Sequence, residues 1–115
     1  MKLRVALAQI NPTVGDLAGN SALIAATITS AQESGANILV FPEMVVTGYP
    51  VEDLALRPSF QLASKQAISD IARGIDGDLV AFIGYLDTWP TTTPALPRFN
   101  SCRCESTLAP AGHEA

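Results

Sequence analysis

Residues 38–43 read Ile38-Leu39-Val40-Phe41-Pro42-Glu43, and this stretch decides the fold. A short run of apolar residues without alternation is typical of a strand that is covered on both faces. Strands of this kind belong to parallel sheets that are flanked by helices. The run therefore predicts an α/β fold in which the carboxylate of Glu43 follows directly on a buried strand.

The chain on either side of this run supplies two further strands. Residues 2–9 alternate, and Leu3, Val5 and Leu7 are expected on one face of a strand. Residues 78–86 are almost wholly apolar and predict a third strand of the buried kind. Because helical segments separate the three strands, the order is β-α-β-α-β, which favours a mostly parallel sheet covered by helices.

Helix signals fill the intervals between the strands. Asn20 is a suitable N-cap for a first helix, and Gly35 suits the left-handed position just after its end. Ser59 is expected to cap a second helix, which ends near Gly74. Between the two helices, residues 42–52 form a loop rich in proline and glycine, and a short helical turn is expected after it.

The composition argues against several classes of partner. The 115 residues are 48% hydrophobic, with a mean hydropathy of +0.26 and a formal net charge of −4, so we expect a packed core and no nucleic-acid or anionic-membrane surface. No apolar run approaches the roughly 20 residues of a membrane helix, and Lys2 and Arg4 interrupt the N-terminus where a secretory signal is apolar. The two cysteines, Cys102 and Cys104, form no disulfide framework. We therefore expect a cytoplasmic protein that binds neither nucleic acid nor membranes.

Glu43 is the residue best placed for chemistry. Loops at the carboxyl ends of parallel strands converge on a crevice, and Pro42 restricts the backbone that presents this carboxylate. Partial desolvation beside a buried strand end would favour its use as a general base. The same position also fits an exposed loop acid or a carboxylate that accepts hydrogen bonds from nearby backbone N–H groups. Spacing alone leaves these interpretations open.

Several segments resemble one known family. Residues 39–43, Leu-Val-Phe-Pro-Glu, resemble the first catalytic motif of the nitrilase (carbon–nitrogen hydrolase) superfamily. Residues 47–54, Thr-Gly-Tyr-Pro-Val-Glu-Asp-Leu, and 57–60, Arg-Pro-Ser-Phe, resemble the glutamine-amidase domain of glutamine-dependent NAD synthetases. The segments nearer the N-terminus that share this resemblance are Ala-Leu-Ala-Gln-Ile-Asn-Pro at 6–12, Val-Gly-Asp-Leu at 14–17 and Gly-Asn at 19–20. The resemblance covers residues 2–89.

The resemblance implies the N-terminal part of an αββα sandwich and a catalytic set of glutamate, lysine and cysteine. The cysteine thiolate attacks the side-chain amide carbon of glutamine and forms a thioester as ammonia leaves. Glu43 matches the glutamate that acts as general base, and the lysine stabilises the oxyanion. Tyr49 and Glu52 lie in the loop that lines the substrate pocket in relatives, whereas loop packing and a helix N-terminal acid are their plain alternatives.

The same resemblance bears on cofactors and partners. Ammonia passes to a separate synthetase domain that uses ATP, so this chain itself is expected to hold no cofactor. Glutamine is the expected substrate of the complete protein. A homo-oligomer is implied only by analogy with relatives that assemble.

The lysine and the cysteine of this catalytic set have no match in the chain. Lys2 precedes the first strand, and Lys65 falls on the second helix rather than after the third strand. Cys104, followed by a glutamate, imitates the family's Cys-Glu dipeptide, but it comes too early and no apolar strand precedes it. Cys102, Cys104 and His113 also lack the spacing of metal ligands, so no metal site is predicted.

The chain is predicted to divide into a partial carbon–nitrogen hydrolase domain, residues 1–89, and an irregular tail, residues 90–115. The tail carries Pro, Thr and Arg residues without helical or strand periodicity. We interpret the chain as the opening, truncated part of the amidase domain and expect it to be inactive by itself. We also hypothesise that the tail is a frameshifted or prematurely ended translation, which reading the other two frames past codon 90 would test.

Two alternative functions remain open on the sequence. One is a generic nitrilase-like amidase that acts on another amide or on a nitrile. The other is a non-catalytic domain that binds a protein partner, because an incomplete sandwich leaves apolar helix and sheet faces uncovered.

Overall fold

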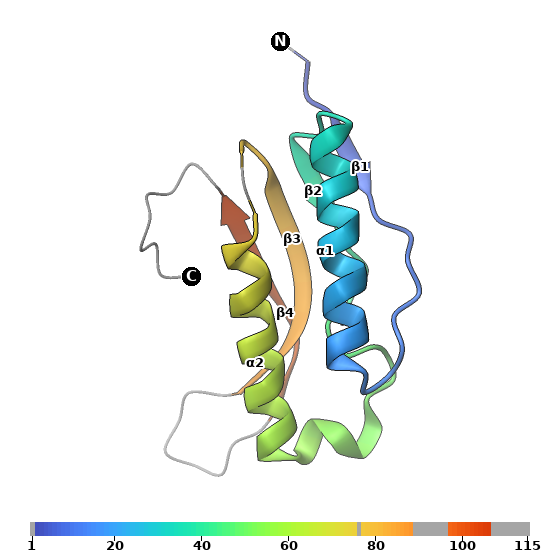
Figure 1. Ribbon diagram of the computed structural model, residues 1–115. Helices are drawn as coiled ribbons and strands as arrows, with labels where there is room; N and C mark the ends of the chain where they lie inside the picture. Colours follow the sequence, from blue (N-terminus) through green and yellow to red (C-terminus); the bar gives the residue numbers. More distant parts are fainter. Residues whose placement is uncertain (1, 76, 89–96, 107–115) are drawn as a thin grey trace.

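The structure is a computed structural model that describes residues 2–75, 77–88 and 97–106 (Figure 1). In chain order its elements are β1 (Val5–Leu7), α1 (Leu17–Glu33), β2 (Ile38–Val40), the 3-10 helix η1 (Glu52–Leu56), α2 (Pro58–Arg73), β3 (Val80–Thr88) and β4 (Pro97–Ser106). The β-α-β-α-β order predicted from the sequence is confirmed by the segment from β1 to β3, and η1 is the short helical turn expected before the second helix.

All four strands belong to one sheet, in the order β1-β2-β3-β4. β1, β2 and β3 are parallel, whereas β4 pairs with β3 in the antiparallel direction. The three parallel strands therefore end at the same edge of the sheet. The loops that follow β1 and β2 leave from that edge.

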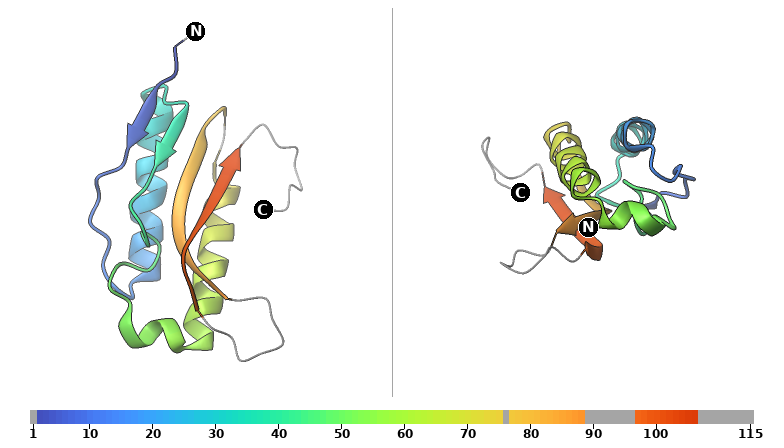
Figure 2. Two further views of the ribbon diagram at one scale, coloured as in Figure 1. Left: turned by 180° about the vertical axis from the view of Figure 1, so that it is seen from behind. Right: turned by 90° about the horizontal axis from the view of Figure 1, so that it is seen from below.

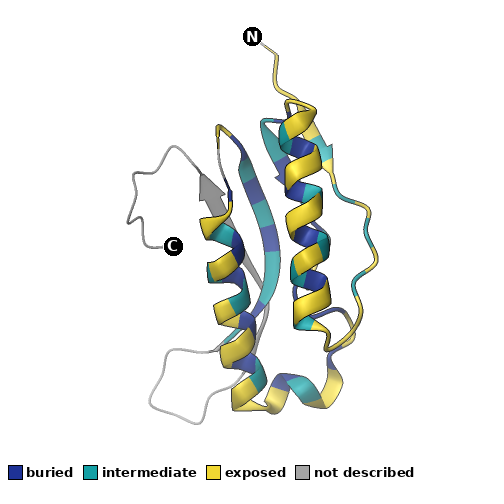
Figure 3. Cartoon of the chain, in the orientation of Figure 1, coloured by how far each residue is buried: buried dark blue, intermediate teal, exposed yellow. Residues whose placement is uncertain are grey.

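Both long helices lie on the same face of the sheet. Figure 1 shows α1 and α2 in front of the strands, and the view from behind in Figure 2 shows no described helix over the other face. The core fills the space between the helices and the sheet and includes Ile24 and Ile28 of α1, Ile68 of α2, and Leu39, Ala81 and Ile83 of the strands. Both helices turn their exposed side away from this core (Figure 3).

The opposite face of the sheet, which we call the open face, carries apolar side chains in register. Side chains alternate along a strand, so the neighbours of Leu39 and Ala81 point away from the helices. They form two rows across the sheet, Val5–Ile38–Val80 and Leu7–Val40–Phe82. Within the described residues, nothing covers these rows as a helix covers the other side.

One expectation about the strands is confirmed, because Val5 and Leu7 share one face of β1, and another needs correction. Val5 is 49% and Leu7 is 69% exposed, whereas Ala6 between them packs against the helix-side core. The strand around Leu39 was expected to be covered on both faces, but its neighbours Ile38 and Val40 are only half-buried. The sequence pattern marks an apolar face correctly but does not show which layer covers it.

The helix ends also differ from the sequence expectations. Asp16 caps α1 in place of Asn20, because its carboxylate accepts a hydrogen bond from the N–H of Gly19 at 3.0 Å. Asn20 consequently lies inside the first turns of the helix and is buried. α2 begins with Pro58 at its first position, where a missing N–H costs nothing, so Ser59 is not its cap.

Strand β4 corrects the irregular tail that was expected over residues 90–115. Residues 97–106 pair with β3 although they lack apolar alternation. Backbone N–H and C=O groups at the edge of β3 offer hydrogen bonds to any extended chain, and this pairing does not depend on side-chain pattern. Residues 90–96 and 107–115 lie outside the described residues, so the prediction for them stays open.

Candidate functional site

Two loops meet at the edge where the parallel strands end. One connects β1 to α1 through residues 8–16, and the other connects β2 to η1 through residues 41–51. The N–H of Gly15 in the first loop donates to the C=O of Thr47 in the second at 2.9 Å. Open α/β sheets place their ligands at this edge, so the pair of loops around Glu43 is the candidate site.

The backbone directly after Glu43 is strained. Met44 has a φ of 56°, a left-handed conformation that costs a residue with a side chain on the order of 1 kcal/mol. Its side chain is fully buried beside Leu86, and its C=O accepts a hydrogen bond from the N–H of Gly48 at 2.8 Å. Strain of this kind persists only where the surroundings enforce it, and it is concentrated at functional sites.

The turn of residues 43–47, which we call the Glu43 turn, begins on the open face of the sheet, whereas its Val45 and Val46 belong to the helix-side core. A Cβ atom added to Gly84 would sit 2.8 Å from the backbone N of Met44 and 3.4 Å from the Cα of Glu43, so the turn passes directly over this glycine. Gly84 alternates with the inward-facing Ile83 and therefore points away from the helices. The N–H of Val46 donates to the C=O of Gly84 at 3.3 Å and ties the turn to β3.

Asn20 of α1 binds the same turn through a hydrogen bond from the helix side. It is 2% exposed, and its Nδ2 donates to the C=O of Val46 at 3.0 Å and to the C=O of Thr13 at 2.8 Å. Its Oδ1 accepts from the N–H of Thr13 at 2.8 Å. The orientation of the amide is fixed, because the reverse orientation would place its NH2 group against the N–H of Thr13.

Sequence reasoning missed this role of Asn20. A polar residue near the start of a helix is usually interpreted as a cap, and Asn20 is among the residues that favour that position. One signal was present: Asn20 stands four residues before Ile24 and eight before Ile28, so it belongs to the buried stripe of α1. A polar residue on such a stripe needs partners, and a loop backbone is the nearest source of them.

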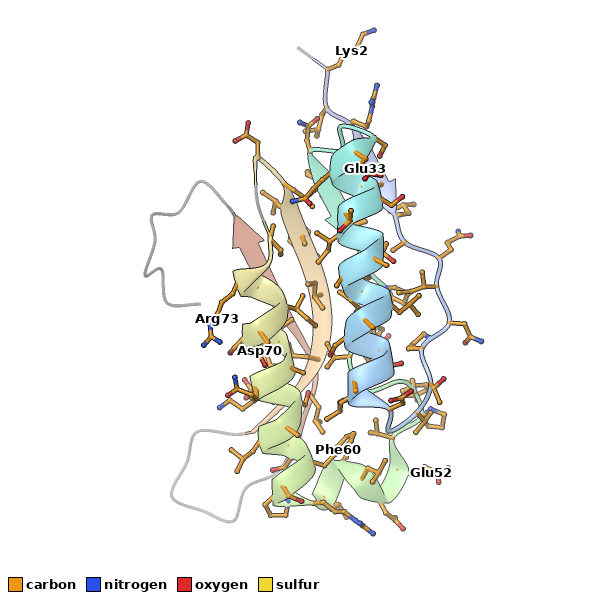
Figure 4. The ribbon with its side chains drawn as sticks, viewed as in Figure 1. Lys2, Glu33, Glu52, Phe60, Asp70 and Arg73 are labelled. Atoms are coloured by element: carbon orange, nitrogen blue, oxygen red, sulfur yellow. The ribbon has the colours of Figure 1, made fainter. Side chains whose placement is uncertain are left out.

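The predicted site residues share one loop, and the structure leaves their side chains in solvent. Glu43 is exposed, and its carboxylate makes no hydrogen bond or ion pair with the described part of the chain. Tyr49 is 71% exposed, so loop packing does not account for it. Glu52 is the exposed first residue of η1, and Figure 4 shows it pointing away from the helices. The partial desolvation expected for Glu43 is therefore not supplied by the described residues.

Lys65 lies on the wrong side of the sheet to assist Glu43. Its Nζ is 3.4 Å from Oδ1 of Asp87, and it belongs to α2, which covers the helix side of the sheet. Glu43 and Met44 pass over Gly84 on the open face. Lys2 is exposed at the far end of the molecule, before β1 (Figure 4).

Two other kinds of site find no support in the described part of the chain. There, no three His, Cys, Asp or Glu side chains gather in a way that could hold a metal ion. None of the described helices is long and apolar enough to cross a membrane. The backbone of Cys102 and Cys104 lies in β4, and His113 lies outside the described residues, so the expectations for these three are not tested.

Comparison with known proteins gives consistent matches. The sequence profile of the carbon-nitrogen hydrolase family matches residues 4–105, which extends beyond the residue 89 where the resemblance in the sequence ended. The glutamine-dependent NAD(+) synthetase of Xylella fastidiosa is 44% identical over 89 residues, which cover 76% of this chain and 15% of the synthetase. The chain spans about 15% of the length of the curated relatives that it matches.

Solved structures agree with the sequence matches. The glutamine-dependent NAD+ synthetase from Acinetobacter baumannii, in complex with ADP, matches with a TM-score of 0.77 and 28% identity, over 96% of this chain and 20% of that chain. An amidase from Nesterenkonia sp. matches with a TM-score of 0.57 and 28% identity, over 77% of this chain and 33% of that chain. The layers of helix and sheet seen here are thus the N-terminal part of the fold of these proteins.

Proposed function

The chain belongs to the carbon–nitrogen hydrolase family, and from this membership we propose that it forms the first part of a glutamine-amidase domain. In the complete protein, this domain would hydrolyse the side-chain amide of glutamine and supply ammonia to an ATP-dependent synthetase that makes NAD. One observation carries the proposal: a strained turn, fastened to both β3 and α1, presents Glu43 at the carboxyl edge of a parallel sheet.

Glu43 would act as the general base of this reaction. It takes the proton of a cysteine thiol, and the thiolate adds to the amide carbon of glutamine. The C–N bond then breaks, ammonia leaves with the proton, and a thioester remains for water to hydrolyse to glutamate. A lysine would stabilise the oxyanion, but Lys65 and Lys2 do not reach the Glu43 turn. We therefore propose that the cysteine and the lysine come from later parts of the complete protein.

The exposure of Glu43 fits this proposal. A second sheet packs on the first in an αββα sandwich, and the two apolar rows of the open face provide the surface for it. Covering this face would bury Val5 and Leu7 and would also exclude water from the Glu43 carboxylate. Electrostatic interactions of that carboxylate would become stronger as the water leaves.

Tyr49 and Glu52 are proposed to lie on the substrate side of the site. The ring of Tyr49 is mostly exposed although a loop residue of this size usually packs, which leaves it available to a ligand. Glu52 adopts a left-handed conformation with φ of 49°, a further strained position in the same loop. An acid at the first position of η1 is also favourable to the helix, so its substitution must be judged by its effect on glutamine binding.

A hybrid protein tests the proposal. In this hybrid, residues 4–88 replace the matching segment of the Xylella fastidiosa synthetase, so that the remaining catalytic groups come from the relative. We expect the rate of NAD formation with glutamine to stay within about 10-fold of the rate of the parent enzyme. The exchanged segment differs only in residues that support the site. Ammonium supplied in place of glutamine measures the synthetase part separately. A hybrid that uses ammonium at the parent rate but cannot use glutamine would contradict the proposal.

The generic amidase remains the second candidate and is tested with the same hybrid. Its weakness is that the Nesterenkonia amidase matches less of the chain, and at a lower TM-score, than the Acinetobacter synthetase. Asparagine and a simple aliphatic amide are suitable competing substrates. The cytoplasmic location and the homo-oligomer stay predictions from the sequence.

A further inference from the structure

We propose that Asn20 is a positioning residue, which holds the Glu43 turn in its reactive orientation through the C=O of Val46. The inference rests on the proposed role of Glu43 as a base. It goes beyond that role because it assigns a function to the buried side-chain amide of Asn20 on α1, which is not one of the catalytic groups. The three hydrogen bonds of Asn20 all join backbone groups of the two loops, so its effect on the reaction would be transmitted through these loops.

The geometry places Val46 between two supports. Its N–H donates to Gly84 of β3 at 3.3 Å, and its C=O accepts from Asn20 of α1 at 3.0 Å. The peptide groups of the turn are therefore held by strand β3 and by helix α1 together. Val46 is fully buried and stands three residues after Glu43, within the turn that the strained Met44 begins.

The Asn20 amide also binds the loop after β1, residues 8–16. Asn20 exchanges two hydrogen bonds with the backbone of Thr13, both at 2.8 Å. Two residues further on, Gly15 donates to the C=O of Thr47 at 2.9 Å. One side chain thus joins the loop after β1 to the loop after β2, and both loops border Glu43.

Loss of the Asn20 amide should change the conformation of the Glu43 turn as well as the interior around Asn20. Its removal leaves the C=O of Val46 without its donor in the interior and withdraws one of the restraints on a strained turn. The turn can then relax from the left-handed conformation at Met44 and rotate Glu43. A carboxylate displaced by about 1 Å from its reacting partner can cost roughly 100-fold in rate.

The hybrid protein supplies the kinetic test, with Asn20→Ala and Asn20→Asp as variants. The aspartate keeps the acceptor for the N–H of Thr13 but loses both donors and sets a carboxylate against two C=O groups. We expect both variants to lower kcat with glutamine by about 10- to 100-fold and to change KM by less than about 3-fold. NAD formation from ammonium should stay unchanged.

Asn37→Ala is the matched control. Asn37 also binds backbone, accepting from the N–H of Arg4 at 2.8 Å, but it lies before β2 and therefore at the opposite edge of the sheet. It should lower thermal stability without changing kcat. The inference is overturned if Asn20→Ala is as fast with glutamine as Asn37→Ala. If Glu43→Gln is also as fast as the hybrid, the proposed function itself has failed.

Hydrogen exchange on the 115-residue chain gives a second measurement, which does not require turnover. We expect Asn20→Ala to speed exchange at the amides of Gly15 and Gly48, which close the two loops, by at least about 10-fold. The amide of Gly74, bonded to the C=O of Ile71 at the end of α2, should be unaffected. Equal changes at all three amides, or none, would show that Asn20 does not act selectively on the turn and would overturn the inference.

Discussion

The two faces of the sheet differ in what they contribute. On the helix side, Leu39, Ala81 and Ile83 are at most 1% exposed and are enclosed by α1 and α2. On the open face, in-register Val5 and Leu7 stay largely in solvent, and the Glu43 turn lies over Gly84. The comparison teaches that the helix side buries the core that holds the chain folded, whereas the open face presents Glu43, for which we propose the catalytic role.

The largest stability difference should separate a core residue from an open-face residue. Ile83→Ala removes a fully buried side chain and should lower the free energy of unfolding by about 2–4 kcal/mol. Leu7→Ala removes a side chain that is already in water and should cost less than about 0.5 kcal/mol. Urea unfolding followed by circular dichroism measures both. Equal losses in the two variants would mean that the open face is covered, and would contradict the difference in burial between the two faces.

Gly84→Ala should have an intermediate effect that links the open face to the site. The new methyl group would lie 2.8 Å from Met44 N, so the turn must move, and we expect a loss of about 1–3 kcal/mol in the free energy of unfolding. Glutamine-supported turnover of the hybrid should fall as well. Gly74→Ala is the control, because there the nearest atom lies at an ordinary 3.5 Å. Unchanged turnover in Gly84→Ala would show that the turn does not need its close approach to β3.

A small effect is expected for Lys65 on the helix side. Lys65→Met removes a half-exposed ion pair with Asp87, which should change the free energy of unfolding by less than about 1 kcal/mol. Glutamine-supported turnover of the hybrid should stay within about 2-fold, because the sheet separates Lys65 from the Glu43 turn. A loss of turnover with unchanged stability would place Lys65 in the site and contradict the assignment of faces.

The position of Glu43 could be predicted from the sequence because it depends on local rules. An apolar run of strand length, a proline and an acid define a strand end wherever they occur, and the helices between strands impose the parallel order. The same reasoning placed the left-handed Gly35 after α1. Each of these features needs only neighbours in the chain.

Features that depend on distant partners could not be predicted in the same way. Alternation in residues 2–9 has the same pattern whether helices or a second sheet cover the apolar side. The strand β4 arises from the free edge of β3 rather than from its own pattern. The role of Asn20 depends on Val46, which is 26 residues away in sequence.

The most direct test of the account is the rate of the hybrid when Glu43 is changed to Gln, with Glu33→Gln as the control. Glu33 is an exposed acid at the end of α1, so its substitution should have no effect. We predict that Glu43→Gln lowers glutamine-supported kcat by at least about 100-fold, the usual contribution of a general base, while ammonium-supported NAD formation is preserved. Glutamine-supported turnover of Glu43→Gln equal to that of Glu33→Gln would contradict the account, because the open face would then carry no base.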